Sequence, residues 1–305
     1  MEAQATQPSP LAVQPRPPGR DDQAQGEPFI RIEPPKGWRL VNWRELVAYR
    51  DLLTQFVLRD VSARYKQTVL GYAWAVIRPV FSMVVFTVIF GNLAAVPSDG
   101  APYALFSYAA LLPWTYFSGA LGGATNSLTA QKGIFTKVYF PRLIIPLAPV
   151  ITGLVDFAIA SVVLAGLMVY YGVAPTLNVV FLPLLILIMV ATAFGAGLWL
   201  SSLSVQYRDV NQAMTFAMQL LMYAAPVVWP VSLIVEKFPV WGETLRLVYG
   251  LYPMAGVIEG FRASLLGTVP MPWDLIAIGA GVAAFLVITG SLLFRRMERT
   301  FADVA

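Results

Sequence analysis

Basic side chains that could bind an anion are concentrated in the first part of the sequence. Four of them lie just before the first long apolar run: Arg59, Arg64, Lys66 and Arg78. An arginine guanidinium binds two phosphate oxygens at once, so this group could hold a phosphorylated headgroup. General attraction to anionic lipids, worth about 1 kcal/mol per basic residue, explains the same charges equally well. Either explanation predicts that the segment lies at a membrane surface.

One carboxylate, Asp156, lies near the middle of a long uncharged stretch. Carriers driven by protons or sodium ions usually need several ionisable groups within the membrane, so one aspartate gives little support for ion coupling. A proton relay or a substrate contact is one interpretation of Asp156. The favoured interpretation is a helix-packing group bonded to a neighbouring serine or threonine. The energy for any pumping is then expected to come from a second chain.

The sequence contains no histidine and no cysteine. This excludes histidine general bases, thiolate nucleophiles, disulfides and the usual zinc ligands. The Gly-x-x-x-x-Gly-Lys-Ser/Thr motif of ATP-hydrolysing P-loops does not occur either. No catalytic residue, no metal site and no cofactor is therefore predicted on this chain.

Composition sets the fold class. Of the 305 residues, 57% are hydrophobic and only 12% are charged, whereas a soluble domain usually has about a quarter of its residues charged. Helices satisfy their own backbone hydrogen bonds in lipid, and long apolar runs are their signature. The sequence predicts an all-α integral membrane protein.

The chain is expected to start with a disordered, proline-rich cytoplasmic tail over residues 1–37. Residues 38–68 are predicted to form an amphipathic interface helix, because apolar residues recur there at three- and four-residue spacing between Trp43 and Val61. A helix packed on a soluble neighbour is the alternative.

A six-helix transmembrane domain is predicted over residues 69–296. Its first span could begin earlier than its apolar run, near Gly71, with Arg78 reaching the interface. Residues 231–273 hold two apolar runs that are too short to cross and are broken by prolines, so two short re-entrant helices are expected there, on the periplasmic side before the last span. Residues 297–305 form the expected cytoplasmic C-terminus. The predicted spans are 80–96, 103–125, 143–170, 177–203, 210–229 and 275–294.

The distribution of basic residues predicts the orientation, because lysine and arginine are retained on the cytoplasmic side. With both termini cytoplasmic, only Lys237, Arg246 and Arg262 of the 21 basic residues face the periplasm. Glu259, three positions before Arg262, predicts a local ion pair. Four glycines are assigned to close helix packing, either within one subunit or across a dimer: Gly119, Gly123, Gly195 and Gly197.

Five short strings occur in order along the chain and together carry a family resemblance. They resemble the permease subunits of polysaccharide-exporting ABC transporters, and within that group the O-antigen exporter permeases. The resemblance covers the chain from about Trp43 to Phe294, and it departs at Tyr252-Pro253, where related sequences often have Asn-Pro. The strings are residues 59–71, 111–114, 137–142, 207–210 and 253–262.

This resemblance implies a homodimer with two copies of a cytoplasmic ABC ATPase subunit, which would bind ATP and magnesium. It implies a lipid-linked glycan as substrate, carried from the cytoplasm to the periplasm across the bacterial inner membrane, and no nucleic acid. Capsular polysaccharide, teichoic acid or a small hydrophobic compound are alternative cargoes within the class. An integral-membrane glycosyl- or acyltransferase is the alternative from another class, although clustered acidic or histidine side chains, which such enzymes usually need, are missing.

The resemblance also assigns residues. The loop after the second predicted span would couple the chain to the ATPase, although ordinary retention of positive charge on the cytoplasmic side explains its basic residues as well. The four basic residues near the first span would guide a lipid pyrophosphate. Aromatic rings could stack on sugar faces and line a channel, or form an ordinary interfacial belt. The coupling residues are Lys132, Lys137, Tyr139 and Arg142, and the channel aromatics are Trp74, Phe81, Phe90, Phe106 and Tyr116.

Overall fold

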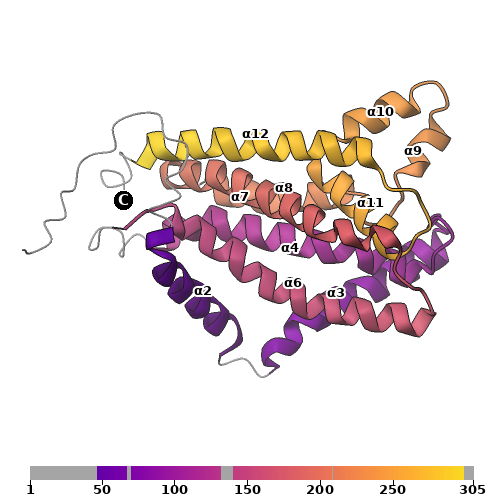
Figure 1. The fold of residues 1–305 in the computed structure, drawn as a ribbon, viewed down its shortest axis with the longest axis horizontal. Helices are drawn as coiled ribbons and strands as arrows, with labels where there is room; N and C mark the ends of the chain where they lie inside the picture. The colour runs from indigo at the N-terminus through magenta and orange to yellow at the C-terminus, as the bar shows by residue number, and fades with distance from the viewer. Residues whose placement is uncertain (1–46, 67–69, 132–139, 208, 299–305) are drawn as a thin grey trace, which may run out of the picture. The chain divides into compact units, whose positions relative to one another are not determined.

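The computed structural model describes residues 47–66, 70–131, 140–207 and 209–298, and within these ranges it contains helices and no strands (Figure 1). The all-helical class predicted from composition is confirmed. The proline-rich tail, the first part of the interface helix and the coupling residues Lys132, Lys137 and Tyr139 lie outside the described residues.

The predicted interface helix is present as α2, Arg50–Tyr65. Phe56 is its one buried residue, and the Phe56 ring lies 5.9 Å from that of Phe140, next to the start of α6 (Ile144–Tyr171). The separation of apolar and polar side chains on α2 is weaker than the predicted amphipathic pattern, since apolar Leu58 is exposed while charged Asp60 is partly buried. Tertiary contacts with α6, in addition to amphipathicity, therefore hold α2 in place.

The first predicted span begins at the earlier of its two expected positions. A continuous helical segment runs through η1 (Gly71–Ala73), α3 (Trp74–Phe86) and η2 (Thr87–Leu93), the last of which is a π-helix. Arg78 lies inside this segment with its side chain exposed, and the helix continues past this one charged residue. At the other end, a Cβ on Gly91 would lie 2.8 Å from the ring of Tyr103, whose hydroxyl donates a hydrogen bond to the Val228 carbonyl at 2.7 Å.

Among the described residues, four helical segments are long and apolar enough to cross a membrane: Gly71–Leu93, Ile144–Tyr171 (α6), Leu177–Gln206 (η3 and α7) and Trp273–Glu298 (α12). They correspond to four of the six predicted spans and make the chain a multi-pass membrane protein. The other two predicted spans are the helices α4, Tyr103–Ala130, and α8, Asp209–Ala224. Tyrosine, serine and glycine lower the hydropathy of α4, and α8 has only 16 residues. The count of six stays a prediction.

Helix α4 is the most buried long element, and α6, α7 and α11 (Pro253–Leu265) pack around it (Figure 1). Glycines allow this close packing, as predicted for three of the four: a Cβ on Gly123 would lie 2.8 Å from Pro149, one on Gly197 would lie 2.7 Å from Ala124, and one on Gly195 would lie 2.6 Å from the backbone of α12. Gly119 does not pack against the rest of the described chain, because a Cβ there would meet nothing within 4 Å, so its assignment to packing across a dimer stays a prediction.

Residues 231–273 form three short helices instead of the predicted two: α9 (Ser232–Lys237), α10 (Gly242–Tyr249) and α11 (Pro253–Leu265). Pro253 divides one of the predicted apolar runs, because it is favoured in the first turn of a helix and begins α11. Every residue of α11 is buried. Helices α9 and α10 lie at one end of the bundle and the last turn of α12 lies at the other (Figure 1). Whether these segments re-enter a membrane stays a prediction.

Candidate functional site

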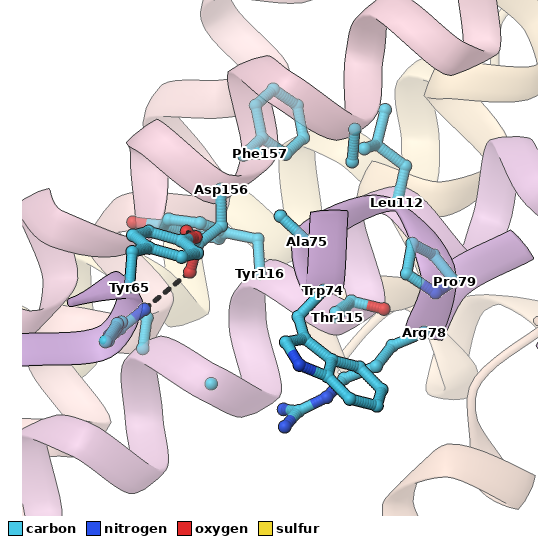
Figure 2. A pocket seen from close by; sticks show the side chains of 15 residues that line it. Tyr65, Trp74, Ala75, Arg78, Pro79, Leu112, Thr115, Tyr116, Asp156 and Phe157 are labelled. Carbon is cyan, nitrogen blue, oxygen red and sulfur yellow. Dashed lines mark hydrogen bonds and ion pairs between the residues drawn. The ribbon is translucent and has the colours of Figure 1, made fainter. Parts of the chain in front are cut away.

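A cavity of about 460 Å³ lies where α2 and the first span meet α4 and α6 (Figure 2). This volume falls within the range of small-molecule sites in proteins. Its walls combine two arginines, one carboxylate and two tyrosines with a larger apolar surface. The lining residues are Arg64, Tyr65, Trp74, Ala75, Arg78, Pro79, Leu112, Thr115, Tyr116, Gly119, Ala120, Gly153, Asp156, Phe157 and Ala160.

An ion pair between α2 and α6 forms one side of the cavity. Nη1 of Arg64 lies 2.5 Å from Oδ2 of Asp156, and the Tyr65 hydroxyl donates a hydrogen bond to the other carboxylate oxygen. Both charged side chains are about one-third exposed. The partner of Asp156 is thus an arginine and a tyrosine from α2, so the predicted hydrogen bond to a neighbouring serine or threonine is wrong.

Tyr65 is fixed as a hydrogen-bond donor. Its ring stacks on that of Tyr72, with the centroids 4.1 Å apart. Burial, and then the hydrogen bond to the Asp156 carboxylate, raise the pKa of the Tyr65 hydroxyl well above its ordinary value. The phenol therefore stays protonated at physiological pH and continues to donate to Asp156.

Arg78 lies on another side of the cavity, against Trp74 (Figure 2). The two residues are one helical turn apart on α3, and the guanidinium carbon lies 5.7 Å from the indole centroid. Within the part of the chain that the structure describes, Arg78 pairs with no carboxylate. Among the described residues of the cavity, the guanidinium of Arg64 is thus neutralised by Asp156, whereas that of Arg78 lies over the ring of Trp74 without a carboxylate partner.

Helices α4 and α6 also supply an aromatic part of the cavity wall. The Tyr116 hydroxyl donates to the Val150 carbonyl at 3.0 Å, and its ring meets that of Phe157 edge to face at 5.9 Å. A Cβ on Gly153 would lie 3.2 Å from the Tyr116 ring, so glycine at this position allows the ring to lie close against α6. Gly119, by contrast, has free space above it and leaves room in the cavity.

The structure brings together two of the four basic residues predicted to bind a lipid pyrophosphate. Arg64 and Arg78 line the cavity, whereas Arg59 and Lys66 do not. Arg59 pairs with Asp60 at 2.9 Å and lies over the Phe56 ring. Lys66 is exposed at the end of α2.

The five predicted channel aromatics occupy different environments. Trp74 and Tyr116 line the cavity, and Phe81 is 68% exposed on the surface of α3. Phe90 packs against Phe86. Phe106 is fully buried, and one face of its ring is covered by a guanidinium, so no surface of this ring is free for a sugar.

Arg142 is the one predicted coupling residue that lies in the described ranges. Its guanidinium donates to the backbone carbonyl of Glu298, in the last turn of α12, at 2.6 Å. The segment before α6 is therefore tied to the end of the last span.

Sequence reasoning missed the burial of Glu259 and Arg262. Their ion pair, at 2.9 Å, was predicted, but both side chains lie in the interior. Arg262 also donates to the carbonyls of Phe106 and Val227, while Glu259 accepts from the backbone N–H of Val231. This network ties α11 to α4 and to the turn after α8. The signal available in the sequence was the absence of other charges from residues 253–265.

Comparison with known proteins is consistent with this architecture. Residues 52–266 match the family described as ABC-2 type transporter. A protein of Myxococcus xanthus named "O-antigen export system permease protein RfbA" is 29% identical over 261 residues, which cover 85% of this chain and 97% of that protein. Two Klebsiella pneumoniae proteins with the same name are 28% and 27% identical, each over 83% of this chain and 95% of their own length.

Proposed function

The chain belongs to the ABC-2 type transporter family, and from this premise we propose that it is the permease subunit of an ATP-driven exporter of a lipid-linked polysaccharide of the O-antigen type. It is a transport subunit and not an enzyme, as the names of its relatives indicate. In this proposal two copies form the channel, and ATP hydrolysis takes place on two copies of a separate cytoplasmic ATPase subunit.

The cavity between α2, α3, α4 and α6 is the observation that carries this proposal. A polyprenyl pyrophosphate linked to sugars combines a dense negative charge with a hydrocarbon chain, and the cavity offers two guanidinium groups beside an apolar and aromatic wall. Guanidinium groups bind phosphate oxygens through paired hydrogen bonds. Tyr116 and Trp74 have flat faces on which apolar groups pack. We assign Arg64 and Arg78 to the headgroup on this basis.

The proposal includes a topology. Six crossings follow if α4 and α8 span the membrane together with the four strongly apolar helices, and both termini then face the cytoplasm of a bacterial inner membrane. The end of α12 and the segment around Arg142 lie on that side, next to the ATPase, and Lys132, Lys137 and Tyr139 belong to the same coupling segment. Helices α9, α10 and α11 then face the periplasm.

Export from cells tests the function directly. The chain and its ATPase partner are expressed in a host whose own O-antigen exporter is deleted, and the polymer that reaches the surface is quantified by gel and antibody. Arg64→Ala and Arg78→Ala should each reduce export at least ten-fold with unchanged membrane abundance. Arg59→Ala, which alters a basic residue of the same helix outside the cavity, is the matched control and should leave export within two-fold.

Partner identity is tested in the same strain. Affinity purification of the tagged chain should recover an ATP-hydrolysing subunit in a one-to-one ratio. Export that continues after the ATPase gene is deleted would contradict the proposal. Purification of the chain with no ATPase bound, from cells that export the polymer, would contradict it as well.

A further inference from the structure

The cavity already contains an anion of its own. Asp156 is the one acidic residue among the described residues of its lining, and it forms an ion pair with the guanidinium of Arg64. A headgroup phosphate that binds Arg64 must therefore compete with Asp156. The assignment of Arg64 to a phosphate leaves this competition unexplained, and it leaves Tyr65 without a role.

We propose that Asp156 is a resident counter-ion that a lipid pyrophosphate displaces from Arg64, so that binding of the headgroup releases the end of α2 from α6. This inference rests on the proposed function, because it requires that Arg64 and Arg78 receive a phosphorylated lipid. It adds a binding mechanism, a role for Asp156 and a movement.

The exposure of the ion pair makes displacement feasible. Arg64 and Asp156 are each about one-third exposed, and pairs of this kind usually change an equilibrium constant by about five-fold or less. A pyrophosphate brings more negative charge and more acceptor oxygens than one carboxylate, and Arg78 is available to bind it at the same time. The buried pair of Glu259 and Arg262 shows the opposite design, since its arginine makes two further bonds to backbone carbonyls and is 1% exposed.

Release of this ion pair would affect only one end of α2. Arg64 and Tyr65 are in its last turn and are the residues that hydrogen-bond to Asp156. Phe56, two turns earlier, is buried against Phe140 and does not depend on the ion pair. Helix α2 would therefore stay attached by its middle while its last turn moves away from α6.

The apolar wall favours a lipid headgroup as the ligand over free phosphate. Leu112, Phe157 and Trp74 line the same cavity as the two arginines, and Gly119 leaves space beside them. The first isoprene unit next to a pyrophosphate would bury its apolar surface there. Inorganic pyrophosphate has the charge without this apolar part.

Equilibrium binding tests the competition. The full-length protein is placed in nanodiscs of phosphatidylcholine, and three probes are titrated: farnesyl pyrophosphate, inorganic pyrophosphate and farnesol. Asp156→Asn keeps the shape of the side chain and the hydrogen bond from Tyr65 but removes the competing charge, so it should tighten farnesyl pyrophosphate binding about five-fold. Arg64→Ala should weaken it at least ten-fold, and farnesol should not depend on either residue.

The outcomes separate this inference from the proposed function. If Arg64→Ala weakens binding and Asp156→Asn leaves it unchanged or weaker, displacement is refuted while the phosphate site stands. If neither variant affects farnesyl pyrophosphate, the phosphate site itself is refuted. If inorganic pyrophosphate binds as tightly as farnesyl pyrophosphate, the lipid part of the inference fails.

Spin labels test the movement. The sequence has no cysteine, so Ala63→Cys in the last turn of α2 and Val162→Cys on α6, both at exposed positions, give a doubly labelled protein without background. Farnesyl pyrophosphate should lengthen or broaden the measured distance distribution, and Asp156→Ala, which removes both the ion pair with Arg64 and the hydrogen bond from Tyr65, should do so without ligand. A distribution that is unchanged in both experiments, in protein shown to bind the probe, would overturn the release of α2.

Discussion

The guanidinium carbon of Arg262 lies 3.4 Å from the centroid of the Phe106 ring, although the two residues are on different helices and 156 positions apart. One face of the ring is covered by a charge that is itself neutralised by Glu259. From this position Arg262 donates hydrogen bonds to the carbonyl of Phe106 on α4 and to that of Val227 in the turn after α8. A side chain predicted to form a local surface pair thus organises the interior at one end of the bundle.

Removal of this guanidinium should destabilise the protein strongly. Arg262→Ala leaves Glu259 buried without its counter-charge and two carbonyls without a donor, at a cost of about 3–5 kcal/mol. We expect a large loss of folded protein, measured by thermal unfolding in detergent followed by size-exclusion chromatography. Arg246→Ala, which breaks partly exposed pairs with Glu243 on α10 and Asp274 on α12, is the control and should change stability by less than about 1 kcal/mol. Equal effects of the two substitutions would show that the buried network does not carry this stability.

Filling the cavity should abolish transport without unfolding the protein. A Cβ on Gly119 meets nothing within 4 Å, so Gly119→Leu places its side chain in the cavity at little steric cost. Export should fall at least ten-fold while the melting temperature stays within a few degrees. Gly166→Leu, at a position on α6 that is also open and does not line the cavity, should export normally. Normal export by Gly119→Leu would show that the cavity is not used.

The contact between α7 and α12 should not tolerate a side chain at Gly195. A Cβ there would lie 2.6 Å from the backbone nitrogen of Val287, and backbone cannot move aside as a flexible side chain can. Gly195→Ala should cost about 1–3 kcal/mol from overpacking, despite the higher helix propensity of alanine. Thermal unfolding measures this cost when the Gly195→Ala variant is compared with Gly166→Ala, in which the added Cβ meets no neighbouring atom. A stabilised Gly195→Ala variant would contradict the close approach.

The proposed coupling segment makes a prediction of another kind. Lys137→Gln combined with Arg142→Gln should leave insertion and ATP hydrolysis intact but uncouple hydrolysis from export, because the residues transmit movement and do not bind nucleotide. The ratio of polymer exported to ATP hydrolysed, in vesicles that contain the whole complex, checks it. Lys237→Gln, on α9 at the opposite end of the bundle, is the control. An unchanged ratio in the double variant would count against the coupling role.

Features that depend on neighbours in sequence were predicted well. The helical class follows from long apolar runs, and four of the predicted spans coincide with helices that are apolar enough to cross a membrane. The position of Arg78 inside the first span was foreseen as well, because a long side chain can reach the interface from within a helix. Local composition carries this information.

Features that depend on the packing of distant segments were not predictable. Asp156 finds its partners on α2, more than 90 positions away in the sequence, so no local pattern points to them. Gly119 and Gly123 are four positions apart and lie on the same face of α4, yet within the described chain only Gly123 lies against another helix. The burial of Glu259 is likewise decided by helices that cover α11 and not by α11 itself.

The π-helix η2 has a consequence for the second half of the first span. One more residue per turn than in an α-helix brings Gly91 against the Tyr103 ring. If η2 changed to α-helical geometry, the residues after it would rotate about the helix axis by about 100° for each position gained or lost. Phe90 or Asn92 would then replace Gly91 beside the Tyr103 ring, and the side chain of either residue is too large for that contact. Tyr103 also holds the Val228 carbonyl, so a change of helical register in η2 would be transmitted to the turn that follows α8.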